Sequence, residues 1–268
     1  MLAENLAYLL LAVVVISALY LAIKLANIWR AESDEVPNSA SPANETAATP
    51  PTIGGSKPRA DKIRILFLAA NPKETPPLSL GEEVRAIDDA LLRAAHRDLF
   101  EMEQQWAVRL SDLQAHLLRY SPDIVHFSGH GTTANEIILE NEHGESQPVS
   151  AALLSQLFSL LRDNIRCVVL SACYSARQAD AIGDSIDCVV GMNDAMSDSA
   201  AIAFSASFYQ ALAYGRSVGT AFALGANQID LASLPQSHTP HLIDKRAVAD
   251  QTCFVEPSRA HHAPDDAG

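Results

Sequence analysis

IVHFSGHG at residues 124–131 and CVVLSAC at residues 167–173 are the two stretches from which the fold class can be inferred. Each begins with a mostly apolar run rich in β-branched residues, which is typical of a strand buried on both faces. Each run leads directly into small and polar residues, with His130 after the first and Cys173 after the second. Both stretches therefore predict a strand followed by a loop that carries a chemically reactive side chain.

Around these stretches, strands and helices are predicted to alternate between residues 61 and 235. Strands are expected at 63–69, 99–107, 124–128 and 167–171 and in a run ending at 191, and a small hairpin is expected near 136–139. Helices are expected at 80–95, 111–120, 150–161, 197–214 and 217–231. This alternation, with nearly continuous apolar strands, is typical of a mostly parallel sheet covered by helices on both faces. We therefore predict an α/β three-layer sandwich.

The carboxyl ends of the strands are where such a sheet collects its ligands. His130 and Cys173 both follow strands, so we expect their side chains to meet at that edge of the sheet. A nearby imidazole can lower the pKa of a thiol or accept its proton, and the thiolate can then attack a carbonyl carbon. The backbone amides of Gly131 and Cys173 are candidate donors to the resulting oxyanion. The predicted chemistry is hydrolysis of peptide bonds by a Cys-His dyad.

Two carboxylates, Asp194 and Asp198, follow the fifth predicted strand at the same edge. Either could pair with an Arg or Lys side chain of a substrate, because a carboxylate binds these cations through charge-assisted hydrogen bonds. The alternative is that both are solvated loop residues. We keep both aspartates as candidates for the substrate pocket.

The two motifs, followed by FSASFYQALAYG at residues 204–215, resemble the CHAT domain, a bacterial branch of the caspase-like cysteine peptidases. The resemblance implies a caspase-like fold, His130 as the base and Cys173 as the nucleophile. It also implies a role in bacterial defence or regulated proteolysis, switched on by a partner protein. Ser171 and Ser175 stand where the eukaryotic caspase signature has Gln and Gly, so specificity for aspartate does not carry over.

Other readings of these residues are weaker. His126 lies within a predicted strand and is expected to pack rather than react, and Cys167 and Cys188 are flanked by valines and are expected to be buried. Metal ligation by His126, His130, His143 and Cys173 lacks a spacing that would organise it, so no metal is expected. The chain has neither GxGxxG nor GK[ST], so no nucleotide cofactor is expected.

A membrane anchor is predicted in residues 1–30. Residues 6–23 carry no charge and, as a helix rising about 1.5 Å per residue, would roughly cross the hydrocarbon core and contact lipid. A cleaved signal peptide is the alternative, but no Lys or Arg precedes the run. Lys24 and Arg30 follow it, which predicts a single-pass protein of the inner membrane with its catalytic domain in the cytoplasm.

Two further segments are predicted to lack a packed core. Residues 31–60 are rich in Ser, Ala, Pro, Thr and Asn and predict a flexible linker, and residues 236–268 predict a disordered or poorly packed tail.

The net charge of the chain argues against one class of binding partner. The chain has 19 Lys and Arg against 32 Asp and Glu, a net charge of −13, which disfavours binding to nucleic acid. The sequence thus predicts a membrane-anchored cysteine endopeptidase acting on protein substrates and controlled by an activating partner. A catalytically inactive, membrane-tethered adaptor with the same fold is the alternative.

Overall fold

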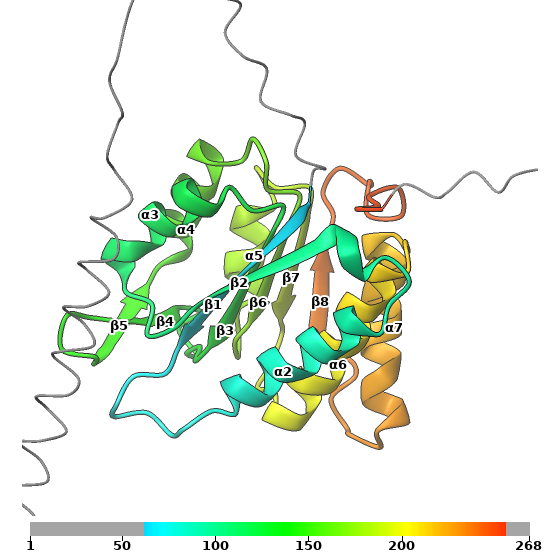
Figure 1. The fold of residues 1–268 in the computed structure, drawn as a ribbon. Helices are drawn as coiled ribbons and strands as arrows, with labels where there is room; N and C mark the ends of the chain where they lie inside the picture. Colours follow the sequence, from blue (N-terminus) through cyan, green and yellow to red (C-terminus); the bar gives the residue numbers. More distant parts are fainter. Residues whose placement is uncertain (1–61, 256–268) are drawn as a thin grey trace, which may run out of the picture. The chain divides into compact units, whose positions relative to one another are not determined.

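The computed structural model describes residues 62–255, which form three layers with a twisted sheet in the middle (Figure 1). The main sheet has the strand order β2-β1-β3-β6-β7-β8, and a separate two-stranded sheet pairs β4 with β5. The strands are β1 (Ile63–Ala70), β2 (Phe100–Gln105), β3 (Ile124–Gly129), β4 (Ile137–Glu140), β5 (Ser146–Val149), β6 (Cys167–Ser171), β7 (Cys188–Met192) and β8 (Pro240–Ile243). All pairs in the main sheet are parallel except β7 with β8. The predicted α/β sandwich with a mostly parallel sheet is confirmed.

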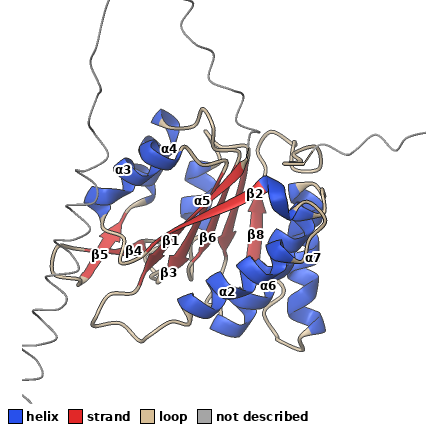
Figure 2. Cartoon of the chain, in the orientation of Figure 1, coloured by secondary structure: helices blue, strands red, loops and turns tan. Residues whose placement is uncertain are grey.

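Helices cover both faces of the sheet (Figure 2). They are α2 (Leu80–Leu92), α3 (Leu110–Tyr120), α4 (Ala151–Leu160), α5 (Ala176–Ile182), α6 (Asp198–Ala213) and α7 (Val218–Leu231), with a short 3-10 turn at Arg97–Leu99. Helix α5 was not predicted from the sequence, because all of its residues except Ile182 are small or polar.

The alternation of side chains along the strands builds two separate cores. In β1, Ile65 and Phe67 pack into the core beneath α2, α6 and α7, whereas Leu66 and Leu68 pack beneath α3, α4 and α5. All four side chains are at most 1% exposed. Because successive residues of a strand point to opposite faces, a nearly continuous apolar run is what a strand buried on both sides requires.

Serine side chains begin three of the helices. Ser150, Ser197 and Ser217 each accept a hydrogen bond from the backbone N–H three residues ahead, at the starts of α4, α6 and α7. A serine in this position satisfies a helix N–H that has no partner within the helix. The helix starts inferred from the sequence at these serines are therefore confirmed.

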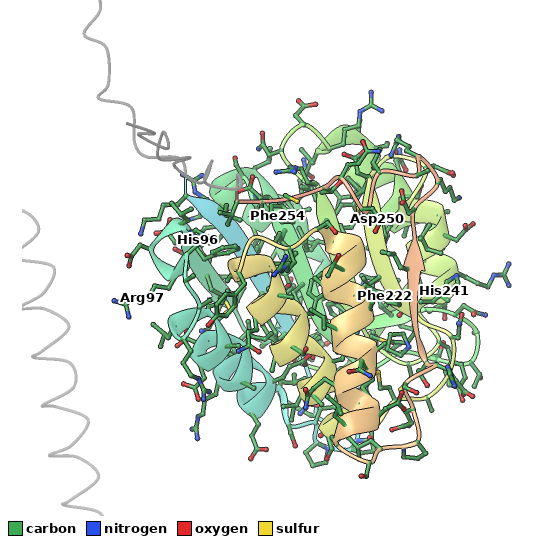
Figure 3. The ribbon with its side chains drawn as sticks, turned by 90° about the vertical axis from the view of Figure 1, so that its right-hand side faces the viewer. His96, Arg97, Phe222, His241, Asp250 and Phe254 are labelled. Carbon is green, nitrogen blue, oxygen red and sulfur yellow. The ribbon has the colours of Figure 1, made fainter. Side chains whose placement is uncertain are left out.

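The C-terminal segment corrects one prediction: residues 236–255 are not a disordered tail. Strand β8 extends the sheet beside β7, and the segment after it crosses the ends of α6 and α7 at Phe254 (Figure 3). The N–H of Val218 donates to Thr252 O at 2.9 Å, and Arg166 Nη2 donates to Cys253 O at 2.7 Å. A few apolar side chains, spaced among polar ones, are enough to hold the segment once a sheet edge and helix ends are available to pair with it.

The predicted anchor at residues 1–30 and linker at residues 31–60 lie outside the described residues. Within residues 62–255, no helix combines the length and apolar character needed to cross a bilayer.

Packing of the C-terminal segment can be tested at Phe254, which is 9% exposed and lies under the Arg166 guanidinium at 4.6 Å. Phe254→Ala should lower the free energy of unfolding by about 3 kcal/mol, because a large buried side chain is lost. Leu231→Ala, at a side chain that is 71% exposed, is the control and should change it by about 0.5 kcal/mol or less. Equal effects in urea unfolding would contradict the packing described here.

Candidate active site

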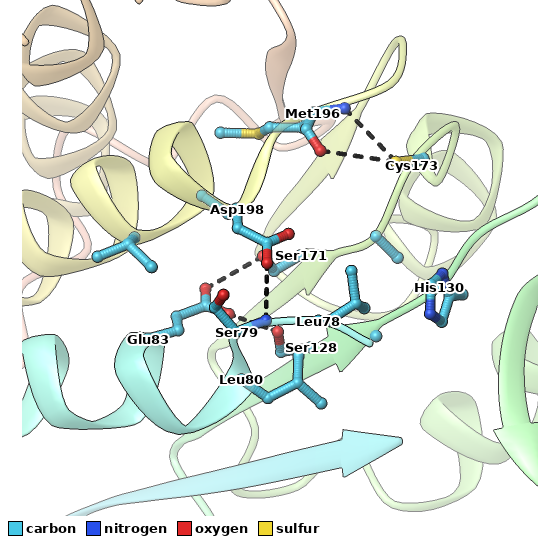
Figure 4. Close-up of a pocket in the computed structure, with 14 residues that line it drawn as sticks. Leu78, Ser79, Leu80, Glu83, Ser128, His130, Ser171, Cys173, Met196 and Asp198 are labelled. Carbon is cyan, nitrogen blue, oxygen red and sulfur yellow. Dashed lines mark hydrogen bonds between the residues drawn. The ribbon is translucent and has the colours of Figure 1, made fainter. Parts of the chain in front are cut away.

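The parallel register of the central strands brings two loops to one edge of the sheet. Ser128 at the end of β3 pairs with Ser171 at the end of β6, so the residues that follow leave the sheet side by side. A pocket of about 50 Å³ opens there, between the start of α2, the ends of β3 and β6, and the start of α6 (Figure 4). His130 and Cys173 both line it. The two side chains that the sequence singled out thus line the same pocket.

The hydrogen bonds of the His130 imidazole fix which nitrogen carries the proton. Nε2 lies 3.0 Å from the carbonyl oxygen of Pro76 and 3.3 Å from Asn71 Oδ1. A carbonyl oxygen only accepts, so Nε2 is the protonated nitrogen of the neutral ring. Nδ1 is then the unprotonated nitrogen, with a lone pair available to accept a proton.

The loop that holds His130 is itself fixed by the β4–β5 hairpin. The backbone N–H of Asn71 donates to Glu140 Oε1 at 3.1 Å, and that of Lys73 donates to Gly144 O at 3.0 Å. Asn71 directly follows β1, so the end of a third strand also contributes to the site. The sequence analysis did not assign this role to the stretch after β1.

Cys173 lies on a sharp turn between β6 and α5. The N–H of Ala172 donates to Leu170 O at 2.9 Å, and Tyr174 adopts a positive φ of 57°. A non-glycine residue in this left-handed region costs about 1–2 kcal/mol, so the surrounding contacts must hold the turn. Ser175 supplies one of them, because its hydroxyl donates to Leu170 O at 2.9 Å and accepts from Met192 N at 3.0 Å.

The sulfur of Cys173 is half-buried and accepts a backbone hydrogen bond. Met196 N donates to Sγ at 3.4 Å, from the loop between β7 and α6 (Figure 4). Sγ in turn donates to Met196 O at 3.9 Å, so this loop contacts the sulfur twice. Cys173, which the sequence predicts to be the nucleophile, is therefore partly accessible and held against this loop.

Gly131 allows the two loops to touch. A Cβ built on Gly131 would overlap the carbonyl oxygen of Cys173 and lie 2.9 Å from its carbonyl carbon. Among the described residues, neither the Gly131 N–H nor the Cys173 N–H has a hydrogen-bond acceptor. These two amides, which the sequence suggested as oxyanion donors, are thus adjacent and available.

The two candidate pocket aspartates lie in different places. Asp198 lines the pocket, where its Oδ2 accepts the backbone N–H of Ser79 at 2.7 Å. Asp194 is exposed and is not among the residues that line the pocket. Its carboxylate instead hydrogen-bonds the hydroxyl of Tyr174 and raises the pKa of that tyrosine.

A buried carboxylate that was not predicted from the sequence also lines the pocket. Glu83, in the first turn of α2, is 3% exposed. The hydroxyls of Ser128, Ser171 and Ser205 all donate to it, the latter two at 3.1 and 2.7 Å. The sequence signal for the burial of Glu83 is its position next to Val84, on the buried side of the helix. The other acidic residues of the helix obscure this signal.

His126 extends this network into the core. It is fully buried, stacks on Phe67 with ring centroids 4.9 Å apart, and lies 3.1 Å from the hydroxyl of Tyr209 through Nδ1. Burial raises the pKa of Tyr209 well above its ordinary value, so the hydroxyl keeps its proton while it hydrogen-bonds Nδ1. The expectation that His126 packs in the core is confirmed.

The remaining ring nitrogen of His126 faces the carboxylate. Nε2 lies 3.3 Å from Glu83 Oε1 without meeting the geometry of a hydrogen bond. Burial raises the pKa of Glu83, whereas nearby His126 and the serine hydroxyls lower it. The lowering is the larger effect, so the pKa of Glu83 lies below its ordinary value. Glu83 is therefore an anion. In the described part of the chain, no cluster of His, Cys, Asp and Glu is arranged to hold a metal ion.

Comparison with known proteins places these residues in a family. The family model described as the CHAT domain matches residues 35–244. The chain belongs to the CHAT domain family. A Roc-COR-CHAT protease from an unknown prokaryotic organism is 28% identical over 187 residues, covering 67% of this chain and 18% of that protein. A probable protease from Gillisia limnaea is 27% identical over 153 residues, covering 56% of this chain and 27% of that protein.

This CHAT protein thus spans less than a third of the length of the curated relatives that it matches. Among solved structures, a secreted C11 cysteine protease from Bacteroides thetaiotaomicron, bound to an irreversible peptide inhibitor, is 9% identical with a TM-score of 0.49. The match covers 68% of this chain and 66% of that one. Caspase-1 from Spodoptera frugiperda is 9% identical with a TM-score of 0.44, covering 69% and 86%.

Contact between the two loops can be tested at Gly131. Gly131→Ala should lower the free energy of unfolding by about 3 kcal/mol, because its methyl group would overlap the backbone of Cys173. Gly81→Ala is the matched control, since nothing lies within 4 Å of a Cβ at that helical position. It should stabilise the protein by about 0.5–1 kcal/mol. Thermal and urea unfolding measure both, and a neutral Gly131→Ala would refute the contact.

Proposed function

We propose that this CHAT protein is a cysteine endopeptidase in which Cys173 is the nucleophile and His130 the general base. The observation that carries the proposal is that both side chains line one pocket while the carbonyl of Pro76 holds the proton on His130 Nε2. The lone pair of Nδ1 can therefore accept the thiol proton without a change of tautomer. Membership of a family with curated relatives named proteases supports the same conclusion.

The proposed reaction proceeds through an acyl-enzyme. Proton transfer from Cys173 to His130 Nδ1 yields the thiolate, which attacks the carbonyl carbon of the scissile peptide bond. The imidazolium then gives its proton to the leaving amine as the C–N bond breaks. Water, deprotonated by the same imidazole, attacks the thioester, releases the acid product and restores the thiol.

The amides of Gly131 and Cys173 are the proposed donors to the tetrahedral oxyanion. Both lack an acceptor among the described residues, so each can donate to an incoming oxygen without breaking an existing bond. Preorganised donors of this kind stabilise the transition state because they need no rearrangement as the charge develops. The tight contact at Gly131 keeps the two amides together.

Substrates with Arg or Lys before the scissile bond fit the pocket best. Asp198 places a carboxylate in the lining, which also includes the apolar side chains of Leu78, Met196 and Ile202. Apolar walls suit the methylene stem of a long basic side chain, and the carboxylate suits its charged end. The pocket of about 50 Å³ accepts the end of one side chain, so the rest of a peptide would lie across the surface above it.

A panel of fluorogenic peptides with Arg, Lys, Asp or Leu before the scissile bond tests the proposal. Wild type should cleave the Arg and Lys peptides, and Cys173→Ala and His130→Ala should abolish cleavage. Asp198→Asn should lower kcat/KM for the Arg peptide about 10-fold more than for the Leu peptide, equivalent to ~1.4 kcal/mol. Asp194→Asn, which changes a carboxylate outside the pocket, should affect the two peptides alike.

Two results would contradict the peptidase proposal. One is an absence of cleavage and of Cys173 labelling by thiol-reactive peptide probes. The other is a complementation assay in which Cys173→Ala and His130→Ala keep the full biological effect, which would favour the adaptor alternative. A selective effect of Asp194→Asn on basic peptides would overturn the assignment of Asp198.

The proposal includes an anchor and a regulated role in bacterial defence, with activation by a partner protein. The uncharged run at residues 6–23, followed by Lys24 and Arg30, supports a single-pass anchor in the inner membrane with the catalytic domain in the cytoplasm. Val14→Arg near the middle of the run should move the full chain out of alkali-washed membranes, because a central Arg costs about 2.5–3.5 kcal/mol on insertion. Val14→Leu is the control. Equal membrane fractions for the two variants would contradict the anchor.

A further inference from the structure

One carboxylate connects the ends of the two strands that lead to His130 and Cys173. Ser128 precedes His130 by two residues and Ser171 precedes Cys173 by two residues. The two serines are register partners on the adjacent strands β3 and β6, and both hydroxyls donate to Glu83. Each serine that bonds the carboxylate therefore stands two residues before a reactive side chain.

Helices on one side of the sheet hold this carboxylate in place. Glu83 belongs to α2, and the hydroxyl of Ser205 on α6 donates to its Oε1 at 2.7 Å. Glu83 and all three serines are at most 8% exposed, so water competes little for these bonds. The carboxylate thus accepts hydrogen bonds from α6 through Ser205 and from two strand ends through Ser128 and Ser171, of which the two strand contacts are drawn in Figure 4.

A direct role in proton transfer does not fit Glu83. Three hydroxyl groups donate to its two oxygens, and its pKa lies below the ordinary value. It is therefore both ionised and occupied. A contribution to folding stability does not by itself account for Glu83. Apolar residues that fill the same space generally stabilise a protein as much as a buried, hydrogen-bonded charge, or more. Such a group is better suited to fixing one geometry.

We propose that Glu83 is a positioning residue for the dyad. By bonding both serines, it fixes the end of β3 relative to the end of β6 and so sets how the His130 imidazole approaches the Cys173 thiol. This inference rests on the proposed peptidase function. A shift of about 1 Å between reacting groups can lower the rate about 100-fold. Loss of a hydrogen bond between Glu83 and either strand serine should therefore lower the rate measurably.

The three serines provide a matched set of variants. Ser128→Ala and Ser171→Ala each release one strand end from the carboxylate. Ser205→Ala removes an equally buried hydroxyl from the same carboxylate, but that hydroxyl comes from α6 rather than from a strand that leads to the dyad. These changes are milder than Glu83→Ala, which would leave three buried hydroxyls without their acceptor and endanger folding.

Two measurements on the full chain separate positioning from stability. The first is kcat and KM on the best cleaved fluorogenic peptide. The second is the rate at which iodoacetamide alkylates Cys173 at about pH 6 and about pH 9, which reports the thiolate that an aligned imidazole supports at the lower pH. Iodoacetamide is small and reacts with Cys173 without the contacts that bind a peptide. Melting temperatures of all variants record the loss of stability.

We expect Ser128→Ala and Ser171→Ala to lower kcat about 10-fold and to lower the alkylation rate at about pH 6 by a similar factor, with KM within about twofold. Alkylation at about pH 9 should stay near the wild-type rate. Ser205→Ala should lower the melting temperature by a similar amount but keep both rates within about twofold. If all three variants lose activity alike, or if none does, the positioning role is wrong.

His130→Ala distinguishes this inference from the function beneath it. If it lowers alkylation of Cys173 at about pH 6 while the strand serines leave the rate unchanged, the dyad stands and the positioning role falls. If it leaves alkylation unchanged and no peptide is cleaved, the peptidase proposal and the positioning role fall together.

Discussion

The parallel pairing of β3 with β6 is the constraint from which the site follows. Because Ser128 and Ser171 are opposite one another, the residues two positions later must leave the sheet at the same edge. Neither strand could slip by one residue, since each is buried on both faces and a slip would exchange the contents of the two cores. The register that packs the apolar side chains is therefore the one that brings an imidazole and a thiol into one pocket. The same β3–β6 register thus meets the needs of core packing and of the candidate active site.

Loops from three strands then complete the pocket, and each is held by contacts outside it. The β4–β5 hairpin fixes the segment after β1, whose oxygens bind His130 Nε2. Ser175 supports the turn that carries Cys173, and the absence of a side chain at Gly131 lets the two loops meet. The site is built mainly from backbone amides and carbonyls whose positions depend on the scaffold. This explains how so few side chains can define it.

Much of the fold could be predicted from the sequence because its signals are local. The apolar runs of β3 and β6, and the serines that begin α4, α6 and α7, are visible within a few residues. Helix α5 and strand β8 were missed because their stability comes from distant partners, such as β7 beside β8. The same limit applies to Glu83, since its burial depends on hydroxyls up to 122 residues away. Between the two aspartates, only the three-dimensional arrangement separates Asp198 in the pocket from Asp194 outside it.

A charge shared among groups on four separate elements also restricts how the sequence can change over time. Replacing the acid alone leaves three hydroxyls without an acceptor, and replacing the hydroxyls one by one leaves the charge progressively unsolvated. Each single step is costlier than the combined exchange for apolar residues. The energetic effects of substitutions at these four positions are therefore coupled, because each polar group satisfies another: Glu83, Ser128, Ser171 and Ser205.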